Sequence, residues 1–575
     1  MQVIFCLFLL QAFAQNLPAG HPPIENSDSV GPSEAEKTFI EVDHDQALLE
    51  LKAIAERLDG PAMAELPIQH NGRIKPLQTL ARETLLFISG KYKPFALEPV
   101  ATFMALPLSP TATSLNVIEI RDPDLREQLG FIKSQRHFSV TALEKSPLLQ
   151  LAQPIMEKEQ RNSRAVSPKE KTVLETYQQL SLAKMVMDGS LFLQTIDFKP
   201  LTDKQPSAGD SAIIQAGQSF LKGLAEGQSG REGTDDLRSA IVQQEVPDLL
   251  KWQIQTTGRE VLLNRAQVFF WTAIALFVLG CLLAVPNLAQ FASDRAIASF
   301  LMIPIALIAI GLGIRVSITG FAPVTNMYGT MIWVSLGIVT FSTLLFFLYK
   351  NRPLTGLLCL ASSLVLFLTE SVPLVLSPDL DPLVAVLRSN YWLTIHVLTI
   401  TISYAAFSIA MVIGNVALIR TLLFSADDNK LFFRAYSHYA YRMIQLGVFL
   451  LTAGIILGGV WADYSWGRFW GWDPKETWAL IADVGFLAIL HARYTGWLRD
   501  FGTLAASPVA YLLVIMAWYG VNFILAAGLH SYGFSSGGAW AVGIFVSLQL
   551  LLLIAALGRH QNVFGGIKRQ KTEPK

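Results

Sequence analysis

The chain has 575 residues, a hydrophobic fraction of 52% and a mean hydropathy of +0.40, values typical of membrane proteins rather than of soluble globular ones. Its 45 basic and 45 acidic residues balance, so charge gives no reason to expect a nucleic-acid partner. The cysteines Cys6, Cys281 and Cys359 all lie in apolar stretches, which argues against a disulfide framework and against a thiol pair that reduces a substrate.

An apolar run at residues 3–13 (VIFCLFLLQAF) opens the chain. It is too short to span a bilayer, which requires about 20 helical residues, and the Ala-Phe-Ala sequence at its end is typical of a signal-peptide cleavage site. We therefore expect residues 1–15 to be a secretory signal. Because the basic residues that normally precede such a run are missing, an uncleaved interfacial anchor or a misassigned start are the alternatives.

Residues 16–265 contain no long apolar run, which predicts a water-soluble domain that the signal would export. Apolar residues recur with helical spacing at 47–58 and in segments near 150–195, whereas residues 114–120 (SLNVIEI) have the pattern of a strand. The stretch from 205 to 235 is rich in Gly, Ser and charged residues, so we expect a loop or linker there. The domain should be mainly helical with some strand.

From residue 266 to residue 575 long apolar runs alternate with short polar segments. This pattern predicts an all-α polytopic membrane bundle of about nine transmembrane helices. The expected spans are 267–286, 297–317, 330–349, 354–376, 391–420, 441–461, 474–497, 508–528 and 540–558.

Basic residues are unevenly distributed over the two sides of this bundle. They gather in the loops and tail on the side of the C-terminus, whereas the short helix ends on the other side hold only Arg315, Arg388, Arg468 and Lys475. The positive-inside rule then places the C-terminus in the cytoplasm and residues 16–265 in the periplasm, with the bundle in a bacterial inner membrane.

Five of the twelve tryptophans gather in one segment between two expected spans, residues 461–478 (WADYSWGRFWGWDPKETW). Its glycines allow close backbone approach, and its indoles offer wide, rigid apolar faces with one N–H donor each. Such a surface suits a large planar ligand. An interfacial aromatic belt is the alternative, although a belt distributes its aromatic residues over many helix ends. The five indoles are those of Trp461, Trp466, Trp470, Trp472 and Trp478.

The residues from Asp473 to Glu476 (DPKE) have the pattern of a helix start, with an acidic N-cap, proline in the first turn and glutamate three residues after the cap. His491 follows Pro474 by 17 residues and should lie about 25 Å deeper in the membrane. His396 is expected about five residues inside the outer end of the fifth span, and His530 just beyond the outer end of the eighth. The sequence therefore predicts two imidazoles at the level of the tryptophan segment.

The segment WGRFWGWDPKETWAL at 466–480 resembles the "WWD" signature of the haem-handling membrane proteins of cytochrome c biogenesis. The resemblance is to the CcsA (ResC) component of the system II cytochrome c synthase, and it covers the chain from Ala266 onward. It implies that haem b is held at the outer membrane face against the tryptophan segment, with Asp473 and Arg468 in the same site. Arg468 and Lys475 are the nearest cations for the haem propionates, although surface pairing or snorkelling would also explain them.

In that family one histidine on each side of the signature binds external haem, and YWLTIHVLTITISYAAF and AAGLHSYGF match those places. The resemblance thus implies that His396 and His530 are axial ligands of the iron. LAILHARYTGW matches the segment with the family's intramembrane histidine, which makes His491 a candidate ligand for incoming haem. The second histidine of that deeper site belongs to a CcsB (ResB) part that this chain lacks. Packing in the bundle is the alternative for any of these histidines and is our interpretation of His438, expected in an inner loop.

Together these features predict the haem-transporting and haem-presenting subunit of a cytochrome c synthase. The expected partners are a CcsB/ResB-like membrane subunit, an apocytochrome c with a C-x-x-C-H segment, a separate thiol-reducing protein and membrane lipid. A haem or small-solute exporter without ligation activity is the alternative function. A quinone-linked cytochrome b-like carrier is a third possibility, and is disfavoured because paired histidines are expected at only one depth.

Several polar residues lie outside these patterns. Glu370, Asp483 and Asn415 fall within expected spans, where polar groups are costly to leave unpaired, and we expect them to join helices rather than to tune haem or conduct protons. The segment LPIQHNGRIKPLQTLARETL at 66–85 also resembles one that precedes the CcsA part in extended forms. Its polar residues His70, Arg73 and Lys75 either face a partner or belong to a solvated loop.

Overall fold

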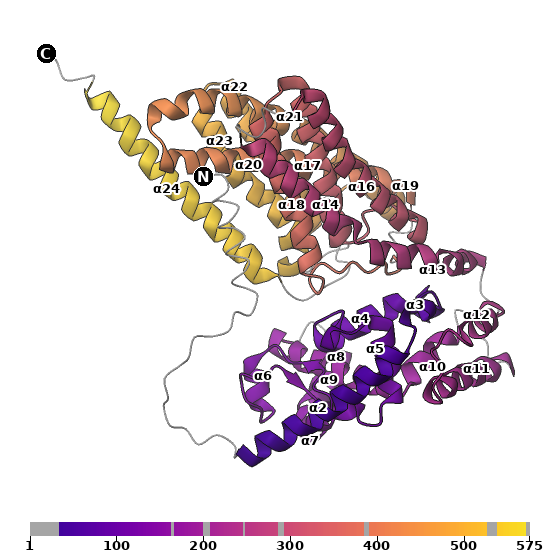
Figure 1. Ribbon diagram of the computed structural model, residues 1–575. Coiled ribbons are helices and arrows are strands. Elements are labelled where there is room, and N and C mark those ends of the chain that lie inside the picture. Colours follow the sequence, from indigo (N-terminus) through magenta and orange to yellow (C-terminus); the bar gives the residue numbers. More distant parts are fainter. Residues whose placement is uncertain are drawn as a thin grey trace. The chain divides into compact units, whose positions relative to one another are not determined.

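The computed structural model describes residues 34–162, 166–198, 208–244, 248–285, 292–383, 390–525 and 538–570. The chain divides between Ala266 and Gln267 into two compact units. Helices dominate both units, and the strands of the described residues are short (Figure 1). The signal predicted for residues 1–15 lies outside the described residues.

The N-terminal unit builds one apolar core from many short helices. Its hairpin β1–β2 is antiparallel, with Pro67 opposite Pro76, and turns through Asn71 and Gly72, both at positive φ, as Asn-Gly turns favour. The elements are α2 (Glu34–Arg57), α3 (Gly60–Met63), β1 (Pro67–His70), β2 (Arg73–Pro76), α4 (Leu77–Ser89), η1 (Pro94–Ala96), α5 (Pro99–Ala105), η2 (Leu106–Leu108), η3 (Ala112–Ser114), β3 (Ile118–Glu119), α6 (Pro123–Gln128), β4 (His137–Phe138), α7 (Val140–Lys145), α8 (Leu148–Arg161), α9 (Pro168–Met187), α10 (Ser190–Ile196), α11 (Ala208–Ala225), α12 (Thr234–Val242) and α13 (Asp248–Ala266).

The expected helices at 47–58 and near 150–195 are confirmed by α2 and by α8 to α10. The prediction of a loop at 205–235 is wrong, because α11 and the start of α12 occupy most of these residues. Ile213, Phe220 and Leu224 of α11 are buried in the core. Burial of this apolar face stabilises the helix although Gly and Ser have low helix propensity. The strand expected at 114–120 shrinks to the two residues of β3.

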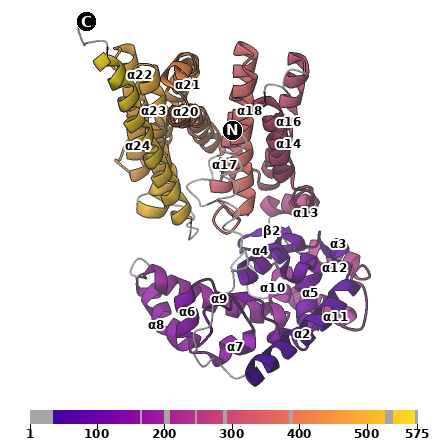
Figure 2. The same ribbon diagram turned by 60° about the vertical axis from the view of Figure 1, so that its left-hand side comes forward.

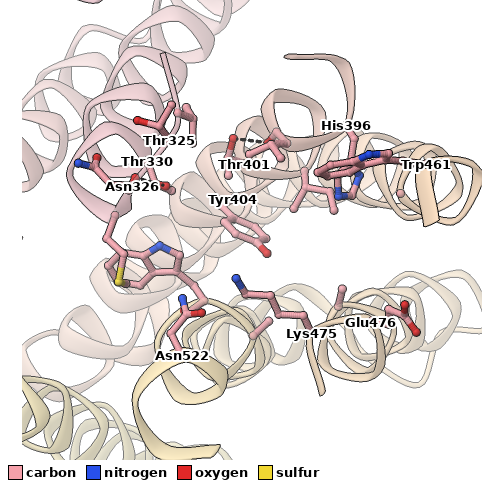
Figure 3. Close-up of a pocket in the computed structure, with 18 of the residues that line it drawn as sticks. Thr325, Asn326, Thr330, His396, Thr401, Tyr404, Trp461, Lys475, Glu476 and Asn522 are labelled. Atoms are coloured by element: carbon pink, nitrogen blue, oxygen red, sulfur yellow. Dashed lines mark hydrogen bonds between the residues drawn. The ribbon is translucent and has the colours of Figure 1, made fainter. Parts of the chain in front are cut away.

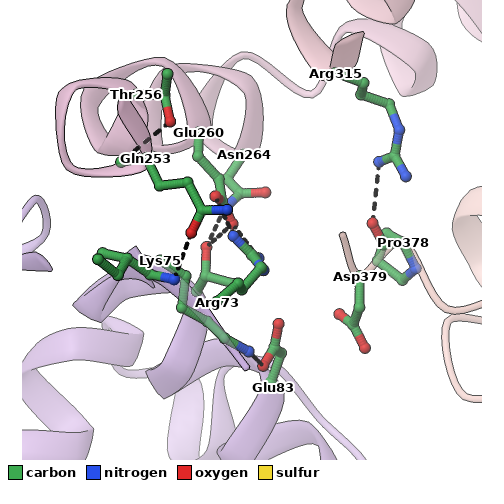
Figure 4. Close-up of polar contacts among 12 residues, drawn as sticks. Arg73, Lys75, Glu83, Gln253, Thr256, Glu260, Asn264, Arg315, Pro378 and Asp379 are labelled. Carbon is green, nitrogen blue, oxygen red and sulfur yellow. Dashed lines mark hydrogen bonds and ion pairs between the residues drawn. The ribbon is translucent and has the colours of Figure 1, made fainter. Parts of the chain in front are cut away.

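Helix α13 is held to the hairpin by buried polar contacts (Figure 4). The Arg73 guanidinium donates to both carboxylate oxygens of Glu260, each at 2.8 Å, and Thr79 donates to the same carboxylate at 2.7 Å. The side chain of Gln253 accepts from the backbone N–H of Ile74. Lys75, fully buried, pairs with Glu83. Arg73 and Lys75 therefore belong to the packing of this unit rather than to a solvated loop.

The second unit is an all-α bundle. Eight helices of the described residues are long and apolar enough to cross a membrane, so the protein is a multi-pass membrane protein. The elements are α14 (Val268–Ala284), α16 (Asp294–Thr319), α17 (Met327–Tyr349), α18 (Arg352–Ser371), α19 (Asn390–Trp392), η6 (Leu393–Val397), α20 (Leu398–Leu423), α21 (Ala426–Trp466), α22 (Pro474–Tyr494), α23 (Asp500–Ile515), η7 (Met516–Leu525) and α24 (Ala539–Gln570).

The expected number of nine spans is one more than these eight. The difference is α22, predicted as the span 474–497: it forms a 21-residue helix packed against α21 and α23, but Asp483, His491 and Arg493 make it less apolar than the others. Helix α21 begins at Ala426, so His438 lies in a helix and not in the expected loop. The same helix extends to Trp466, which limits the connection before α22 to residues 467–473.

Within the bundle the helices form two groups, visible in Figure 2. Helices α14, α16, α17 and α18 share one apolar core, and α20 to α23 form the larger part of another. Packing of α17 against α20 joins the groups. On one side of the bundle α16, α18, α21 and η7 end while α17, α20 and α22 begin, so their connecting segments gather there.

Candidate functional site

A cavity of about 570 Å³ lies at this end of the bundle, within the volume range of small-molecule sites. The start of α17, the segment that follows α18, η6 with α20, the end of α21, the start of α22 and η7 all contribute to its wall (Figure 3). Both helix groups thus contribute, and the connection at 467–473 contributes Phe469 and Trp470.

His396 lines the cavity from η6, a π-helical turn that opens α20; such turns occur often at functional sites. Its Nδ1 lies 2.8 Å from the carbonyl oxygen of Gly454. Because a carbonyl can only accept, Nδ1 carries the hydrogen, and the lone pair of the neutral ring is on Nε2, the atom that could bind a metal. The Trp461 ring stands edge-on to the imidazole, with centroids 5.7 Å apart.

The structure separates the five tryptophans of the 461–478 segment. Trp461, buried, and Trp470 line the cavity, whereas Trp466, Trp472 and Trp478 are not among its lining residues. Trp472 is 71% exposed and has a positive φ of 57°, uncommon for a bulky residue. Its ring meets that of Trp470 at 88° with centroids 5.9 Å apart. The segment therefore does not form a single stack of indoles.

The connection at 467–473 is held by the helix start that the sequence predicts. Asp473 caps α22, and Glu476 completes a capping box. The Glu476 carboxylate also accepts from the backbone N–H of Gly471 at 2.8 Å and pairs with Arg468 at 3.2 Å. The Arg468 guanidinium lies so close to Gly471 that a Cβ there would be 1.7 Å from a guanidinium nitrogen. Asp473 and Arg468 thus shape the backbone beside the cavity and are not among its lining residues.

Lys475, in contrast to Arg468, lines the cavity and points toward Tyr404 of α20 in Figure 3. Two further lining residues, Trp518 and Asn522, come from the second π-helical segment, η7. Tyr404, Trp518 and Asn522 are lining residues that no sequence pattern predicted. The signal available was a tryptophan and an amide four residues apart in the apolar run AWYGVNFIL, and the amide of Asn522 in fact donates to the Trp518 carbonyl.

The segment that follows α18 forms part of the cavity wall, and hydrogen bonds from α16 and from the start of α17 hold its backbone. The Asn326 side chain caps α17 and donates to the carbonyls of Ser377 and Asp379, at 3.1 and 3.0 Å. The buried guanidinium of Arg315 donates to the Pro378 carbonyl at 3.0 Å (Figure 4). One of the cations that the sequence places at the outer helix ends therefore fixes the backbone of this segment.

His530 lies outside the described residues, so its position relative to the cavity is not described. Of the candidate histidines that are described, His491 is not among the lining residues. His491 is in the last turn of α22, at the opposite end from Lys475, where its ring is exposed and its Nδ1 lies 2.9 Å from the Leu487 carbonyl oxygen. Among the described residues no group of three or more His, Cys, Asp or Glu side chains is arranged to hold a metal ion.

Two of the polar residues expected to join helices do so. The Tyr328 hydroxyl donates to Glu370 at 2.6 Å, linking α17 to α18, and the Thr452 hydroxyl donates to Asp483 at 2.8 Å, linking α21 to α22. Asn415 is on α20, and its side-chain oxygen is buried without a hydrogen-bond partner.

These features define a polytopic membrane protein with a histidine- and tryptophan-lined cavity at one end of its bundle. The family model of the cytochrome C assembly protein matches residues 324–530, a range that contains every lining residue of the cavity. CcsA of Guillardia theta is 34% identical over 255 residues, covering 39% of this chain and 81% of that protein. CcsA of Chlamydomonas reinhardtii is 35% identical over 265 residues, covering 45% of this chain and 73% of that protein. The chain belongs to the CcsA family of cytochrome c biogenesis proteins.

A longer match extends beyond the membrane unit. Protein NrfI of Wolinella succinogenes is 29% identical over 498 residues, which cover 80% of this chain. The membrane unit holds less than that share of the chain, so this similarity includes part of the N-terminal unit. The chain spans about half of the length of NrfI, 53%.

Proposed function

We propose that the cavity beside His396 holds haem b at the outer face of the membrane and presents it to an apocytochrome c. Membership of the CcsA family gives this chain a role in cytochrome c maturation. The observation that carries the finer proposal is the orientation of His396: the Gly454 carbonyl fixes Nδ1 as the protonated nitrogen, and the lone pair on Nε2 is the one that haem iron accepts.

The second axial ligand in this proposal is His530. It follows η7 closely in the sequence, and η7 contributes Trp518 and Asn522 to the cavity wall. Ligation by two neutral imidazoles favours a six-coordinate iron and excludes water from the metal. Apolar walls such as those of Trp461 and Trp470 would bury the faces and edges of the macrocycle.

Presentation requires that the haem edge carrying the vinyl groups is accessible to the acceptor. Each thiol of a C-x-x-C-H segment adds its S–H across one vinyl double bond, so no other atoms enter or leave. The protein's contribution is to orient the haem and to limit its oxidation, while a separate thiol-reducing protein keeps the acceptor's cysteines reduced. In this arrangement residues 16–265 are exported and the C-terminus is cytoplasmic.

His491 supports a second element of the proposal, a CcsB/ResB-like membrane partner. Ionisable side chains at membrane depth rarely face lipid, yet His491 is exposed and lies on the same face of α22 as the exposed residues Val484 and Tyr494. Its Nδ1 is occupied by the Leu487 carbonyl, which again places the lone pair on Nε2. A second histidine from the partner would complete a site there for incoming haem.

The test is an optical spectrum of the full chain purified with its native partners and haem. We expect the low-spin spectrum of two-histidine ligation, and we expect His396→Ala to lose it together with maturation of a co-produced exported cytochrome c. Added imidazole should restore part of both. His438→Ala is the matched control, since His438 is a histidine of α21 outside the cavity. A His396→Ala protein with unchanged spectrum and maturation would discard the proposal, and loss of haem without loss of maturation would separate binding from function.

A further inference from the structure

We infer that the guanidinium of Arg420, near the end of α20, binds the phosphate of an anionic phospholipid at the end of the bundle opposite the cavity. Helix α20 follows η6 beside the cavity and ends at Leu423, and the apolar span that contains it ends at the same residue. A side chain in the last turn of a membrane span lies at the depth of the lipid headgroups. This ligand and this end of the bundle differ from those of the proposed haem site, so the inference does not depend on that proposal.

The first support is that no anion of the described chain neutralises Arg420. Among the described residues its side chain makes no ion pair and no hydrogen bond, and its Nε is buried without an acceptor. Asp428, an acidic residue close to it in the sequence, instead accepts from the Ser425 hydroxyl at 2.6 Å. The arginine near the end of α22, by comparison, has its own carboxylate, since Arg493 pairs with Asp500 at 3.3 Å. A half-buried cation without an acceptor is costly, and an external phosphate would supply both the charge and the acceptor oxygens.

The second support is the pair of aromatic rings that holds the guanidinium. Its Cζ lies 4.4 Å from the ring centroid of Phe424, which follows α20 directly, and 4.5 Å from that of Phe432 on α21. The Phe432 ring is itself stacked on Tyr436, with centroids 3.9 Å apart. Contacts with ring faces position the cation and leave its planar N–H fork, which matches the geometry of phosphate oxygens. Because the fork is held in place before a ligand arrives, binding requires little further ordering of the side chain.

The third support concerns the last carbonyls of α20, whose partial negative charge would by itself repel an anion. The Asn429 side chain donates to the Arg420 carbonyl at 3.1 Å, and Nε of Arg559 donates to the Thr421 carbonyl at 3.1 Å. Arg559 is exposed, one residue before the end of the span formed by α24, and α24 packs against α20. Two adjacent spans thus bring one arginine each to the end of α20, which gives this part of the surface a net positive charge suited to an anionic headgroup.

The experiment measures which phospholipid the full chain retains. The protein is purified in detergent that contains equal amounts of phosphatidylglycerol and phosphatidylcholine with the same acyl chains, and is then washed in lipid-free detergent. The lipid that stays bound is extracted and quantified by mass spectrometry. We expect phosphatidylglycerol to be enriched about tenfold, as one additional charge-assisted contact implies.

A wash with millimolar inorganic phosphate distinguishes a lipid from a free anion. We expect the enrichment to persist, because the acyl chains hold the lipid to the apolar helix surface as well. Loss of the enrichment in phosphate would assign the Arg420 site to the free anion and overturn the inferred lipid. Equal retention of the two lipids by the wild type would overturn the site altogether, and would leave the haem proposal untouched.

Four variants separate this site from the general positive charge of the helix ends. Arg420→Met should remove most of the enrichment, whereas Arg420→Lys should retain part of it, because lysine keeps the charge but loses the planar fork. Phe432→Leu should also reduce the enrichment, since the guanidinium loses a ring that positions it. Arg434→Met is the matched control, because Arg434 is an exposed cation near the start of α21, and we expect no change. Equal losses in Arg420→Met and Arg434→Met would show a general charge effect and would overturn the inference.

Thermal unfolding gives a second measurement that does not depend on lipid retention. A ligand that binds the folded state raises the unfolding temperature. Added phosphatidylglycerol should therefore stabilise the wild type and Arg434→Met more than phosphatidylcholine does, and this difference should be absent in Arg420→Met. If phosphatidylglycerol stabilises Arg420→Met as much as the wild type, Arg420 does not bind its phosphate.

Discussion

The imidazole of His396 occupies the space that the missing side chain of Gly458 leaves open. A Cβ built on Gly458 would lie 2.4 Å from Cε1 of His396 and 2.8 Å from its Nδ1. One turn earlier on α21, Gly454 provides the carbonyl that accepts from Nδ1, and a Cβ there would be 2.5 Å from Ile400. Two glycines four residues apart thus allow α21 to approach η6 and α20 closely, and this approach sets the position of the ring.

Gly458→Ala should therefore displace the imidazole without touching any proposed ligand. Alanine raises helix propensity by about 1 kcal/mol over glycine, so the variant should insert and fold, yet we expect its haem content to fall and its absorption band to shift. Gly543→Ala on α24 is the matched control, because nothing lies within 4 Å of a Cβ at that position. Identical spectra for Gly458→Ala and the wild type would show that the close approach does not position His396.

Glu476 is the centre of the connection beside the cavity. Glu476→Ala should leave the backbone N–H groups of Gly471 and Asp473 and the Arg468 guanidinium without this acceptor. Asp473 is buried, so the loss at its N–H should cost about 1–3 kcal/mol, whereas water can replace the acceptor at the exposed Gly471. We expect faster tryptic cleavage after Arg468 and reduced haem retention. Glu476→Gln retains an acceptor oxygen and should be intermediate.

The control for this loop variant is Thr477→Ala. Thr477 follows Glu476 directly, and the hydrogen bond recorded for it is the one from its backbone N–H to Asp473. If cleavage after Arg468 proceeds at the same rate in Glu476→Ala, Thr477→Ala and the wild type, Glu476 is not what holds residues 467–473.

Local chemistry explains which of these features the sequence could predict. The helix start at Asp473 to Glu476 depends on four consecutive residues and is present as expected. The depth of His396, at the level of the tryptophan segment, is predicted by counting residues inward from the span end, whereas its contact with Trp461 is known only from the structure. In contrast, the π-helical turns η6 and η7 arise from tertiary packing and have no periodic signature, so Trp518 and Asn522 were missed.

Where a prediction from the sequence was wrong, packing between residues far apart in the chain determines the observed structure. The Gly- and Ser-rich stretch at 205–235 becomes mostly helical because α11 buries Ile213, Phe220 and Leu224 in the N-terminal core, which propensity alone undervalues. The sequence places the five tryptophans in one segment between two expected spans, whereas in the structure Trp461 and Trp466 belong to the end of α21. The direction of each indole depends on that helix and could not be assigned from composition.

The N-terminal unit offers a separate test, in the buried pair Arg73–Glu260. Removing one partner leaves an uncompensated buried charge, so Arg73→Met and Glu260→Leu should each destabilise the attachment of α13 by about 3–5 kcal/mol. The double variant should recover much of this loss, because neither charge remains. Hydrogen exchange of the α13 amides in the full chain is the measurement.

Arg231→Met is the comparison for this pair. Its partner is Asp59 at 3.0 Å, but the Arg231 side chain is 78% exposed, and exposed pairs contribute about 0–1 kcal/mol. Exchange in α13 should be near the wild-type rate in this variant. If the Arg73 and Glu260 single variants exchange no faster than Arg231→Met, the buried pair does not secure α13 to the hairpin.

The last prediction concerns His491 and the partner proposed for it. The ring is exposed on α22, in line with Val484 and Tyr494. Its Nδ1 faces the Leu487 carbonyl, so the lone pair is on Nε2, and in our proposal a group from a partner completes the metal site there. We therefore expect the chain produced alone to carry little haem, and co-production with a CcsB-like membrane protein to raise the haem content several-fold. That increase should be lost in His491→Ala and retained in His438→Ala, because His438 lies on α21 against Tyr349. Full haem content without a partner would make the site self-contained. If the increase persists in His491→Ala, His491 does not bind haem, and its role is limited to helix packing and its hydrogen bond to the Leu487 carbonyl.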